Sequence, residues 1–536
     1  MPNSALPNQD MGAAGTPAAV RASTAPSSYM LLGLGLATWM EFYTYDGVNL
    51  VLPDMAGTLG PSQDQASWIL TMYLSAMLFG VPLSIWLAAH VGHLRYIIGS
   101  TTVFAVASVG CAMAPDFQTL LLWRAVQGFA GAGLTMWWRA SVYMLMPLPR
   151  RSGSLMRISV ILYLATAVGL VFCGYVTDNF GWRPIFLPNV VFAAVAIRLL
   201  LLHFPEVPRP ADQRTTAVDQ PGILLLCIAL ISLQVVLSRG DIDDWFGSPE
   251  IRLLTSVGSI ALILFVAWQI SPRNPAPLLQ LSLMRRRNVQ AAVTLGLLAG
   301  IILSGSIYGL PEFLRNVFPY RLSATQAGRI MCVYALTAAA IRPLITQAIA
   351  RFGQRKALVF AFTMLVGSML LVARLMTIGT PDTDYTIPLI LYAFCVAPML
   401  SAIAGGTLSR VPLAQQLDAA AIYLTCRQFG ASLGVTLVTT VLDWRETLHS
   451  SRLFEHMRAG GPRTQDRMNQ AALFAVGRGG ASPSQAQQMA LQMLGNEGAR
   501  QAATLAYADA LLFMAAVGVI AICAIPLVSP RQGAKQ

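Results

Sequence analysis

Charged residues are scarce in this chain. Only 11% of its 536 residues are Asp, Glu, Lys or Arg, against about 25% in a typical soluble protein. Hydrophobic residues make up 55%, and the mean hydropathy is +0.59. A water-soluble core cannot hide this much apolar surface, so the composition excludes an ordinary soluble domain and predicts an all-α polytopic membrane protein.

Lysine is nearly absent, occurring only at Lys356 and Lys535. A phosphate-binding P-loop needs Gly-Lys followed by Ser or Thr. Lys356 follows Arg355 and Lys535 follows Ala534, so the sequence has no such site. Uphill movement of a solute would draw on an ion gradient or another subunit, and no cofactor is expected.

Two further classes are disfavoured. The formal net charge is +12, but the basic residues lie between apolar stretches rather than among exposed aromatics, which argues against nucleic-acid binding. The seven cysteines form no C-x-x-C pair, and His90 and His93 share a short loop without a nearby Cys or carboxylate. We therefore expect buried cysteines and no metal site.

Long apolar stretches recur from about residue 28 to the C-terminus. About fourteen of them reach the roughly 20 residues that a bilayer-spanning helix needs. The expected spans are 29–52, 67–88, 96–114, 119–145, 155–177, 185–203, 222–238, 252–270, 289–311, 326–350, 357–376, 387–408, 419–442 and 504–528. The first is too long for a signal-peptide core, so we expect it to be retained.

The arginines indicate the orientation. If residues 1–28 form a disordered cytoplasmic tail, the cytoplasmic segments carry many more basic residues than the short external loops, as the positive-inside rule requires. An even number of helices then returns residues 529–536 to the cytoplasm as a second tail. Most acids lie in the external loops, among them Asp241, Asp243, Asp244, Asp382 and Asp384.

Two cytoplasmic loops repeat one another. Residues 89–95 read Ala-His-Val-Gly-His-Leu-Arg, and residues 350–356 read Ala-Arg-Phe-Gly-Gln-Arg-Lys. Their glycines are 353 − 92 = 261 positions apart, about half the chain. Because transporters are often built from two repeats with a site between them, we expect six-helix bundles at 29–203 and 289–528, separated by two extra central helices with linkers at 204–288.

One external segment, residues 443–503, is much longer than the others. It is polar with intermittent Met and Leu, so a helical conformation is compatible with it. A connection of this length is usually functional. It is expected to be either a solvated cap or a docking surface for a periplasmic partner.

Several segments resemble one known family, the fourteen-helix drug/proton antiporters of the major facilitator superfamily (EmrB/QacA type). They are Met40-Glu41 with Asn49 to Pro53, Arg124-Ala-Val-Gln-Gly128, Gly181-Trp-Arg-Pro-Ile-Phe186, Leu237-Ser-Arg-Gly240 with Asp244-Trp-Phe246, and Arg427-Gln-Phe-Gly-Ala-Ser-Leu-Gly434. The long external segment is similar to the EmrB-like branch. The resemblance implies the major facilitator fold, a bacterial inner (plasma) membrane location, and a periplasmic adaptor with an outer-membrane channel as partners through 443–503.

The sequence departs from the family pattern at functional positions. The usual aspartate of the first helix is Thr44, with Asp46 nearby. The gate aspartate of the second loop is Ala89. The glycine-proline motif of the fifth helix reads Gly169-Leu-Val-Phe-Cys-Gly174, so Leu170 and Cys173 replace its proline and a glycine. The resemblance therefore predicts the fold more firmly than the retention of proton antiport.

Glu41 and Asp46 are candidate proton carriers because ionisable groups inside a membrane are costly, at about 2.5–3.5 kcal/mol on insertion scales. Five residues rotate the helix by about 140°, so the two carboxylates are expected on different faces. The alternative for Asp46 is a position near external water.

Arginines in the spans are the second set of candidates. The resemblance implies proton coupling for Arg124, with Gln127 on the same helix face; a structural interhelical contact is the alternative. Arg342 directly precedes Pro343, and Arg427 lies beside a glycine run, which favours structure or gating for Arg427. Arg139, next to two tryptophans, is expected to snorkel to the interface.

Polar and aromatic residues are expected to line an amphipathic cavity suited to varied ligands. The candidates are Tyr45, Asn49, Tyr163, Tyr308 and Tyr334. Lipid contact or helix packing is the alternative for each of them.

Together these features predict a proton-coupled exporter of amphipathic drugs or toxic compounds that works by alternating access. Two alternatives stay open: an exporter of one endogenous metabolite or siderophore, and a non-transporting membrane sensor. No nucleophile–base pair is visible, so an enzyme is not expected.

Overall fold

The structure is a computed structural model. It describes residues 27–60, 63–205, 219–240, 243–275, 277–317, 322–377, 380–407, 411–412, 415–458, 461–479 and 482–528. The tails expected at 1–28 and 529–536 lie almost wholly outside these residues. The described chain is helical throughout and contains no strand.

Every expected span coincides with a helix. The long helices are α1 (Ser28–Leu59), α3 (Trp68–Val91), α4 (His93–Met113), α5 (Phe117–Leu145), α6 (Leu148–Phe180), α7 (Pro188–His203), α8 (Gln220–Arg239), α9 (Pro249–Ile270), α10 (Arg287–Glu312), α11 (Ala324–Phe352), α12 (Gln354–Leu375), α13 (Thr386–Thr407), α14 (Gln416–Arg458), α15 (Pro462–Gly479) and α16 (Pro483–Ala524). Short turns connect them: α2 (Gln63–Ala66), η1 (Arg183–Phe186), η3 (Trp245–Gly247), η4 (Leu281–Arg285), η5 (Phe313–Val317), η6 (Asp382–Tyr385) and η9 (Ile525–Leu527).

Within the described residues, eleven helices are long and apolar enough to cross a membrane by length and composition. The other three expected spans coincide with α1, α5 and α14. These helices carry the intramembrane charges Glu41, Asp46, Arg124, Arg139 and Arg427, which lower their hydropathy.

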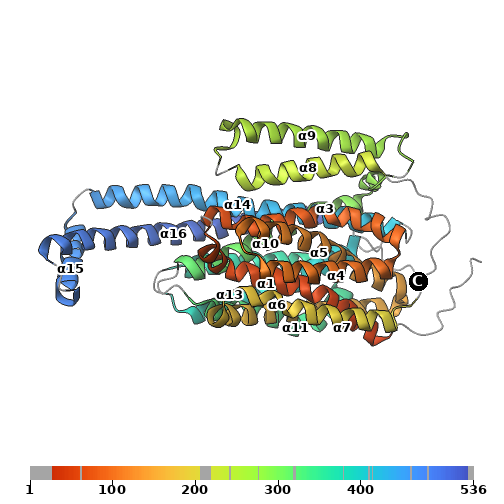
Figure 1. Ribbon diagram of the computed structural model, residues 1–536, viewed down its shortest axis with the longest axis horizontal. Coiled ribbons are helices and arrows are strands. Elements are labelled where there is room, and N and C mark those ends of the chain that lie inside the picture. Colours follow the sequence, from red (N-terminus) through yellow and green to blue (C-terminus); the bar gives the residue numbers. More distant parts are fainter. Residues whose placement is uncertain are drawn as a thin grey trace, which may run out of the picture.

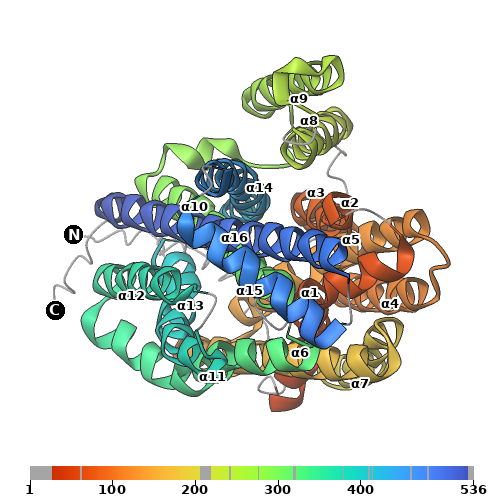
Figure 2. The same cartoon turned by 90° about the vertical axis from the view of Figure 1, so that its left-hand side faces the viewer.

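The long helices run side by side in one bundle (Figures 1 and 2). Helices α1 and α3 to α7 form one group, and α10 to α14 with α16 form the other. The groups meet where α6 packs on α11 and α3 on α14. The hairpin of α8 and α9 stands outside both groups, at the edge of the bundle (Figure 2).

The repeated loops have the same local structure. Gly92 ends α3 and begins α4 with φ +99°, and Gly353 ends α11 and begins α12 with φ +84°. Positive φ values are open to glycine without steric cost. The repeat seen in the sequence is therefore a shared helix–glycine–helix turn.

Helices α10 and α14 touch through glycine, as the spacing of Gly430 and Gly434 predicts. A Cβ on Gly430 would lie 2.2 Å from the backbone oxygen of Leu297, and one on Gly434 would lie 2.1 Å from that of Ile301. Small residues allow such close approach of helix backbones in a membrane. This contact sets the position of Arg427 in α14.

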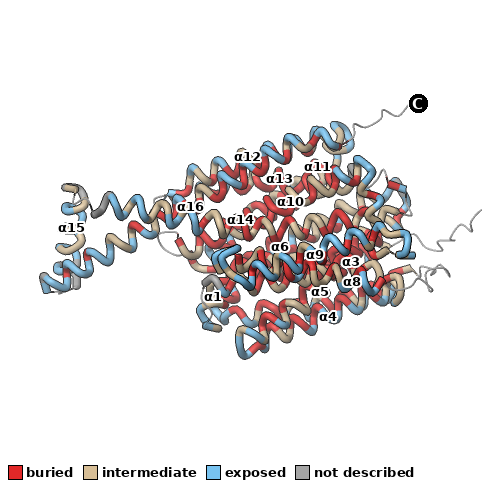
Figure 3. The backbone as a smooth tube through the Cα atoms, turned by 90° about the horizontal axis from the view of Figure 1, so that it is seen from above, coloured by how far each residue is buried: buried red, intermediate tan, exposed pale blue. Residues whose placement is uncertain are grey.

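Residues 443–503 form a helical hairpin rather than a loop. Helix α14 continues to Arg458 and α16 begins at Pro483, with α15 across their tips (Figure 1). Ser482 and Gln485 form a capping box that starts α16. Figure 3 shows few buried residues in the projecting part. We call the end of the bundle from which residues 443–503 project the hairpin end, and the opposite end the open end. The hairpin of α8 and α9 is a separate feature.

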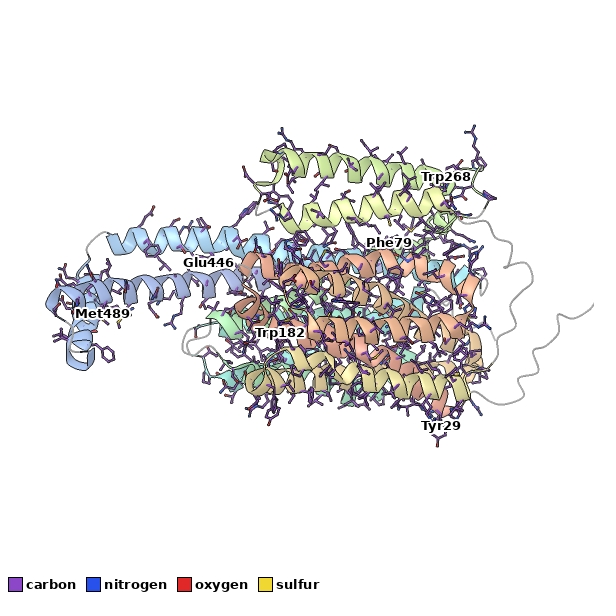
Figure 4. The ribbon with its side chains drawn as sticks, in the orientation of Figure 1. Tyr29, Phe79, Trp182, Trp268, Glu446 and Met489 are labelled. Atoms are coloured by element: carbon purple, nitrogen blue, oxygen red, sulfur yellow. The ribbon has the colours of Figure 1, made fainter. Side chains whose placement is uncertain are left out.

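Asp219 holds the α8–α9 hairpin together at the open end, where Figure 4 places Trp268. Its carboxylate accepts hydrogen bonds from Trp268 Nε1 (2.7 Å), Gln269 Nε2 (2.6 Å) and the backbone nitrogens of Gly222 (3.0 Å) and Leu278 (3.1 Å). Burial alone would raise the pKa of Asp219, but these bonds outweigh it and hold the pKa below its usual range.

Candidate functional site

A cavity of about 750 Å³ lies between the two helix groups. It extends from Asp46 and Ile307 to Gly353–Lys356 at the open end. Seven of the predicted site residues line it: Glu41, Tyr45, Asp46, Tyr163, Tyr334, Arg342 and Arg427. Four predicted residues are not among its lining residues: Asn49, Arg124, Gln127 and Tyr308.

The two carboxylates of α1 reach different neighbouring helices, as their 140° separation predicts. Thr135 Oγ1 of α5 donates to Glu41 Oε2 at 2.6 Å, and Thr166 Oγ1 of α6 donates to Asp46 Oδ2 at 2.6 Å. Both acids are buried. Neither forms an ion pair with a described residue, so each is free to exchange a proton without breaking a salt bridge.

Three arginines share the cavity with these acids. Arg342 donates through Nη1 to the backbone oxygen of Ala397 and to Ser401 Oγ, each at 2.7 Å. Arg139 lies 4.2 Å above the ring of Trp138 and lines the cavity, so its predicted snorkelling to the interface is wrong. The positive charges of Arg427 and Arg139 act electrostatically on Glu41.

Arg124 lies in a separate polar network inside the first helix group. It is fully buried, with Nη1 donating to Gln127 Oε1 at 2.6 Å and Nε donating to the backbone oxygen of Ile69 at 3.2 Å. Gln127 and Asn189 both donate to Ser108 Oγ, and Asn189 also donates to Thr44 Oγ1 at 2.8 Å. Thr44, at the family's aspartate position, therefore joins the network without a negative charge.

Tyr73 of α3 connects this network to the cavity, and sequence reasoning did not single it out. Its ring lies 4.3 Å from the guanidinium of Arg124. A Cβ on Gly131 would lie 2.9 Å from the Tyr73 hydroxyl and 3.6 Å from Glu41 Cγ. The Tyr73 side chain therefore contacts Arg124 of the network and lies near Glu41 of the cavity.

The aromatic candidates divide by position. Tyr45, Tyr163 and Tyr334 line the cavity, with the Tyr163 hydroxyl donating to the backbone oxygen of Val396 at 3.2 Å. Asn49 does not line the cavity; it donates through Nδ2 to the backbone oxygen of Ile307 at 3.0 Å, which joins α1 to α10. Tyr308 follows Ile307 on α10, outside the cavity lining.

The hairpin end of the cavity is closed by contacts between the two helix groups. Arg315 pairs with Asp54 of α1. Asp178 of α6 accepts hydrogen bonds from the backbone nitrogens of Ala324 and Thr325, at 3.1 and 2.8 Å, at the start of α11. These partners are 261, 146 and 147 residues apart, so no local sequence signal marked them.

Glycines allow the same end to close. A Cβ on Gly328 of α11 would lie 2.2 Å from the backbone oxygen of Leu170, and one on Gly174 of α6 would lie 2.5 Å from that of Ala324. Cys173 is buried, and its Sγ would lie 2.5 Å from a Cβ on Gly47. The altered motif of residues 169–174 is therefore a packing surface of α6.

The Major Facilitator Superfamily model matches residues 34–435. Multidrug export protein EmrB of Escherichia coli K12 is 30% identical over 467 residues, 87% of this chain and 90% of that protein. Fatty acid resistance protein FarB of Neisseria gonorrhoeae is 26% identical, covering 80% and 83%. The POT family transporter PepTSo has a TM-score of 0.60 at 13% identity, over 93% of this chain and 99% of that one.

These matches confirm the fold that the helix pattern predicts and the resemblance to EmrB-type proteins. The chain belongs to the Major Facilitator Superfamily of membrane transporters.

Proposed function

We propose that this protein exports amphipathic drugs or other toxic compounds across the bacterial inner membrane in exchange for protons. The observation that carries the proposal is a cavity, open at one end, with two buried carboxylates that have threonine partners instead of arginine partners. The names of the relatives EmrB and FarB, multidrug export and fatty acid resistance, support export of harmful compounds.

The positive-inside rule assigns the open end to the cytoplasm. Its charged lining residues are Arg151, Arg355 and Lys356. The hairpin end then faces the periplasm, and the structure is the inward-facing form, which receives substrate from the cytoplasm. Alternating access requires the contacts at the hairpin end to break and the open end to close.

Glu41 and Asp46 are the proposed proton carriers. A threonine hydroxyl donates to a carboxylate and accepts from a carboxylic acid, so the contacts with Thr135 and Thr166 persist in both protonation states. One proton entering at roughly 150 mV supplies about 3.4 kcal/mol. That energy sustains about a 300-fold gradient of a neutral compound, so a proton gradient is enough for export.

The helical hairpin is the proposed docking site for a periplasmic adaptor, which would link the transporter to an outer-membrane channel. Helix α15 has exposed Leu473, Phe474 and Val476. Helix α14 runs 16 residues beyond its expected span end at 442, or about 24 Å, so these side chains stand clear of the lipid. Exposed apolar groups in water favour a protein partner.

The test of proton exchange uses purified protein in proteoliposomes with an imposed pH gradient. Addition of amphipathic drugs is expected to release protons through the wild type, and Glu41→Gln with Asp46→Asn is expected to abolish the release. Glu250→Gln, an exposed acid at the start of α9, is the control. Unchanged flux in the double variant would contradict the assigned carriers. Drug binding without any flux would contradict transport and favour a membrane sensor.

The test of the docking surface separates transport from partner use. Leu473→Glu with Phe474→Glu is expected to leave flux in proteoliposomes unchanged and to remove drug resistance from cells that express the protein. Resistance that survives this change would contradict an adaptor site on α15.

A further inference from the structure

Helix α8 stands at the edge of the bundle, yet it carries a buried polar side chain. Gln234 is only 2% exposed. The helix packs against α3 of the first helix group and against α14 of the other group (Figure 2). A polar side chain inside a membrane helix is costly unless it is hydrogen bonded. The partners of Gln234 therefore indicate which helices α8 is fastened to.

A chain of hydrogen bonds runs from α14 through α8 to α3. Ser432 Oγ of α14 donates to Gln234 Oε1 at 2.5 Å, and Gln234 Nε2 donates to Ser238 Oγ, one turn along α8, at 3.3 Å. Ser238 Oγ donates in turn to Thr71 Oγ1 of α3 at 3.4 Å. Because α3 and α14 belong to different helix groups, α8 is hydrogen bonded to both groups at once.

The chain of bonds lies towards the hairpin end of the bundle. Thr71 is in the first turn of α3, which begins there at Trp68, and Ser238 is in the last turn of α8. The residue after Ser238 is Arg239, whose side chain is 37% exposed and pairs with Asp243. In alternating access the two helix groups separate at this end. Helix α8 then keeps its bond to one of them and loses its bond to the other.

The two links of α8 differ in the cost of breaking them. Release of Ser432 would leave the amide oxygen of Gln234 without a partner in hydrocarbon, which is costly. The link from Ser238 to Thr71 is long, since hydroxyl hydrogen bonds usually lie within about 3.0 Å, and it adjoins the exposed end of α8. Apolar contacts decide little, because lipid tails are as apolar as the side chains that they would replace.

We propose that α8 is a strap (Gln220–Arg239) that stays fastened to α14 through Gln234 and releases α3 at Thr71 when the hairpin end opens. The inference rests on the proposed export by alternating access and adds Gln234 as a positioning residue. Gln234 does not line the cavity; it acts through Ser432, which follows the cavity-lining Ala431 in α14. Bonded to both groups, the strap favours the inward-facing form; released from α3, it moves with α14.

The first test joins α8 to each neighbour in turn, in the full-length protein in proteoliposomes. The pairs Thr71→Cys with Ser238→Cys and Gln234→Cys with Ser432→Cys are each bridged by a short bis-thiosulfonate reagent that a reductant removes. The bridge to α3 is expected to abolish drug flux, which should return with reductant. The bridge to α14 is expected to leave the flux of the unbridged variant unchanged. The single cysteine variants are the controls. Full flux with the α3 bridge, or lost flux with the α14 bridge, would overturn the proposal.

A substitution tests whether Gln234 fastens the strap. Gln234→Leu removes the bond to Ser432, so labelling of Asn49→Cys, a position buried in this form, by an impermeant thiol reagent outside should rise by about two- to tenfold. Gln220→Leu, the same change at the exposed first residue of α8, is the control. Equal labelling in both would overturn the proposal. If Gln234→Leu does not fold, Ser238→Ala is expected to raise labelling in the same direction, and unchanged labelling in it would have the same meaning.

The two readouts separate this inference from the proposed function, because labelling reports opening of the hairpin end without any transported drug. Labelling of Asn49→Cys that the α3 bridge lowers, with no drug flux in any variant, would uphold the strap and contradict export. Drug flux that neither bridge changes would uphold export and contradict the strap.

Discussion

The two ends of the central cavity are built from opposite kinds of contact. At the hairpin end the helix groups touch through the Asp54–Arg315 pair, the Asp178 cap on α11 and the glycine contacts of α6 and α11. At the open end the charged lining residues of both groups are basic. Opposite charges and close backbones hold one end shut, whereas like charges favour separation at the other.

This difference shows how one end can be closed and still be able to open. Its closing contacts include a few polar bonds and small-residue contacts between the two helix groups. Polar bonds can be exchanged for bonds to water at small net cost.

Locking the hairpin end should abolish transport. In the double variant Asp178→Cys with Thr325→Cys, a disulfide would join α6 to α11 at the point where the native residues are hydrogen bonded. Under oxidising conditions the halves cannot separate there, so drug flux in proteoliposomes should be lost and should return with reductant. Each single cysteine variant is the control, and flux through the oxidised double variant would show that this end does not open.

Preventing closure of the hairpin end should have the second-largest effect. In Gly328→Ala the new Cβ would lie 2.2 Å from the Leu170 backbone oxygen, whereas in the control Gly367→Ala it meets nothing within 4 Å. Overpacking of about 1–3 kcal/mol corresponds to about a 5- to 150-fold shift towards the outward-open form. Thiol labelling of Asn49→Cys from outside should increase in Gly328→Ala; equal labelling in both variants would be a contrary result.

Breaking the Asp54–Arg315 ion pair should shift the closed population by a smaller factor. Arg315 is 9% exposed and Asp54 33% exposed in their side chains, so loss of the pair should cost about 1–2 kcal/mol, or about 5- to 30-fold in the closed population. Arg315→Asp should show this shift by the same labelling, and adding Asp54→Arg should reverse it. Failure of the exchanged pair to restore closure would mean that the two charges do not act together.

The smallest effect concerns Asp219, which anchors α8 and α9 to one another at the open end. Its pKa is held below the usual range, so its stabilisation is present above the unfolded-state pKa of about 3.9 and is lost as pH falls through the folded-state value. Asp219→Asn should lower the free energy of unfolding by about 1 kcal/mol at pH 7. The difference between variant and wild type should shrink below about pH 4. Glu250→Gln is the control, and a difference independent of pH would exclude the carboxylate charge as its cause.

Much of the architecture could be predicted from the sequence. Apolar length located the helices, and the 261-residue repeat located the two Gly92 and Gly353 turns. Helical periodicity placed Glu41 and Asp46 on different faces, and the spacing of Gly430 and Gly434 indicated the contact with α10. These properties depend on residues close in the chain, where the geometry of one helix is enough.

The rest depended on which helices meet. The sequence predicted that Arg139 would reach the membrane–water interface, but the packing of α5 against its neighbours places Arg139 in the cavity lining. The resemblance grouped Arg124 with Glu41, but only Glu41 is among the residues that line the cavity. Asp178 caps a helix 146 residues away. The sequence by itself determined the helices, their ends and their faces through local hydrogen bonding and hydropathy, whereas only the tertiary structure decided which charges share a cavity, because that depends on contacts between distant segments.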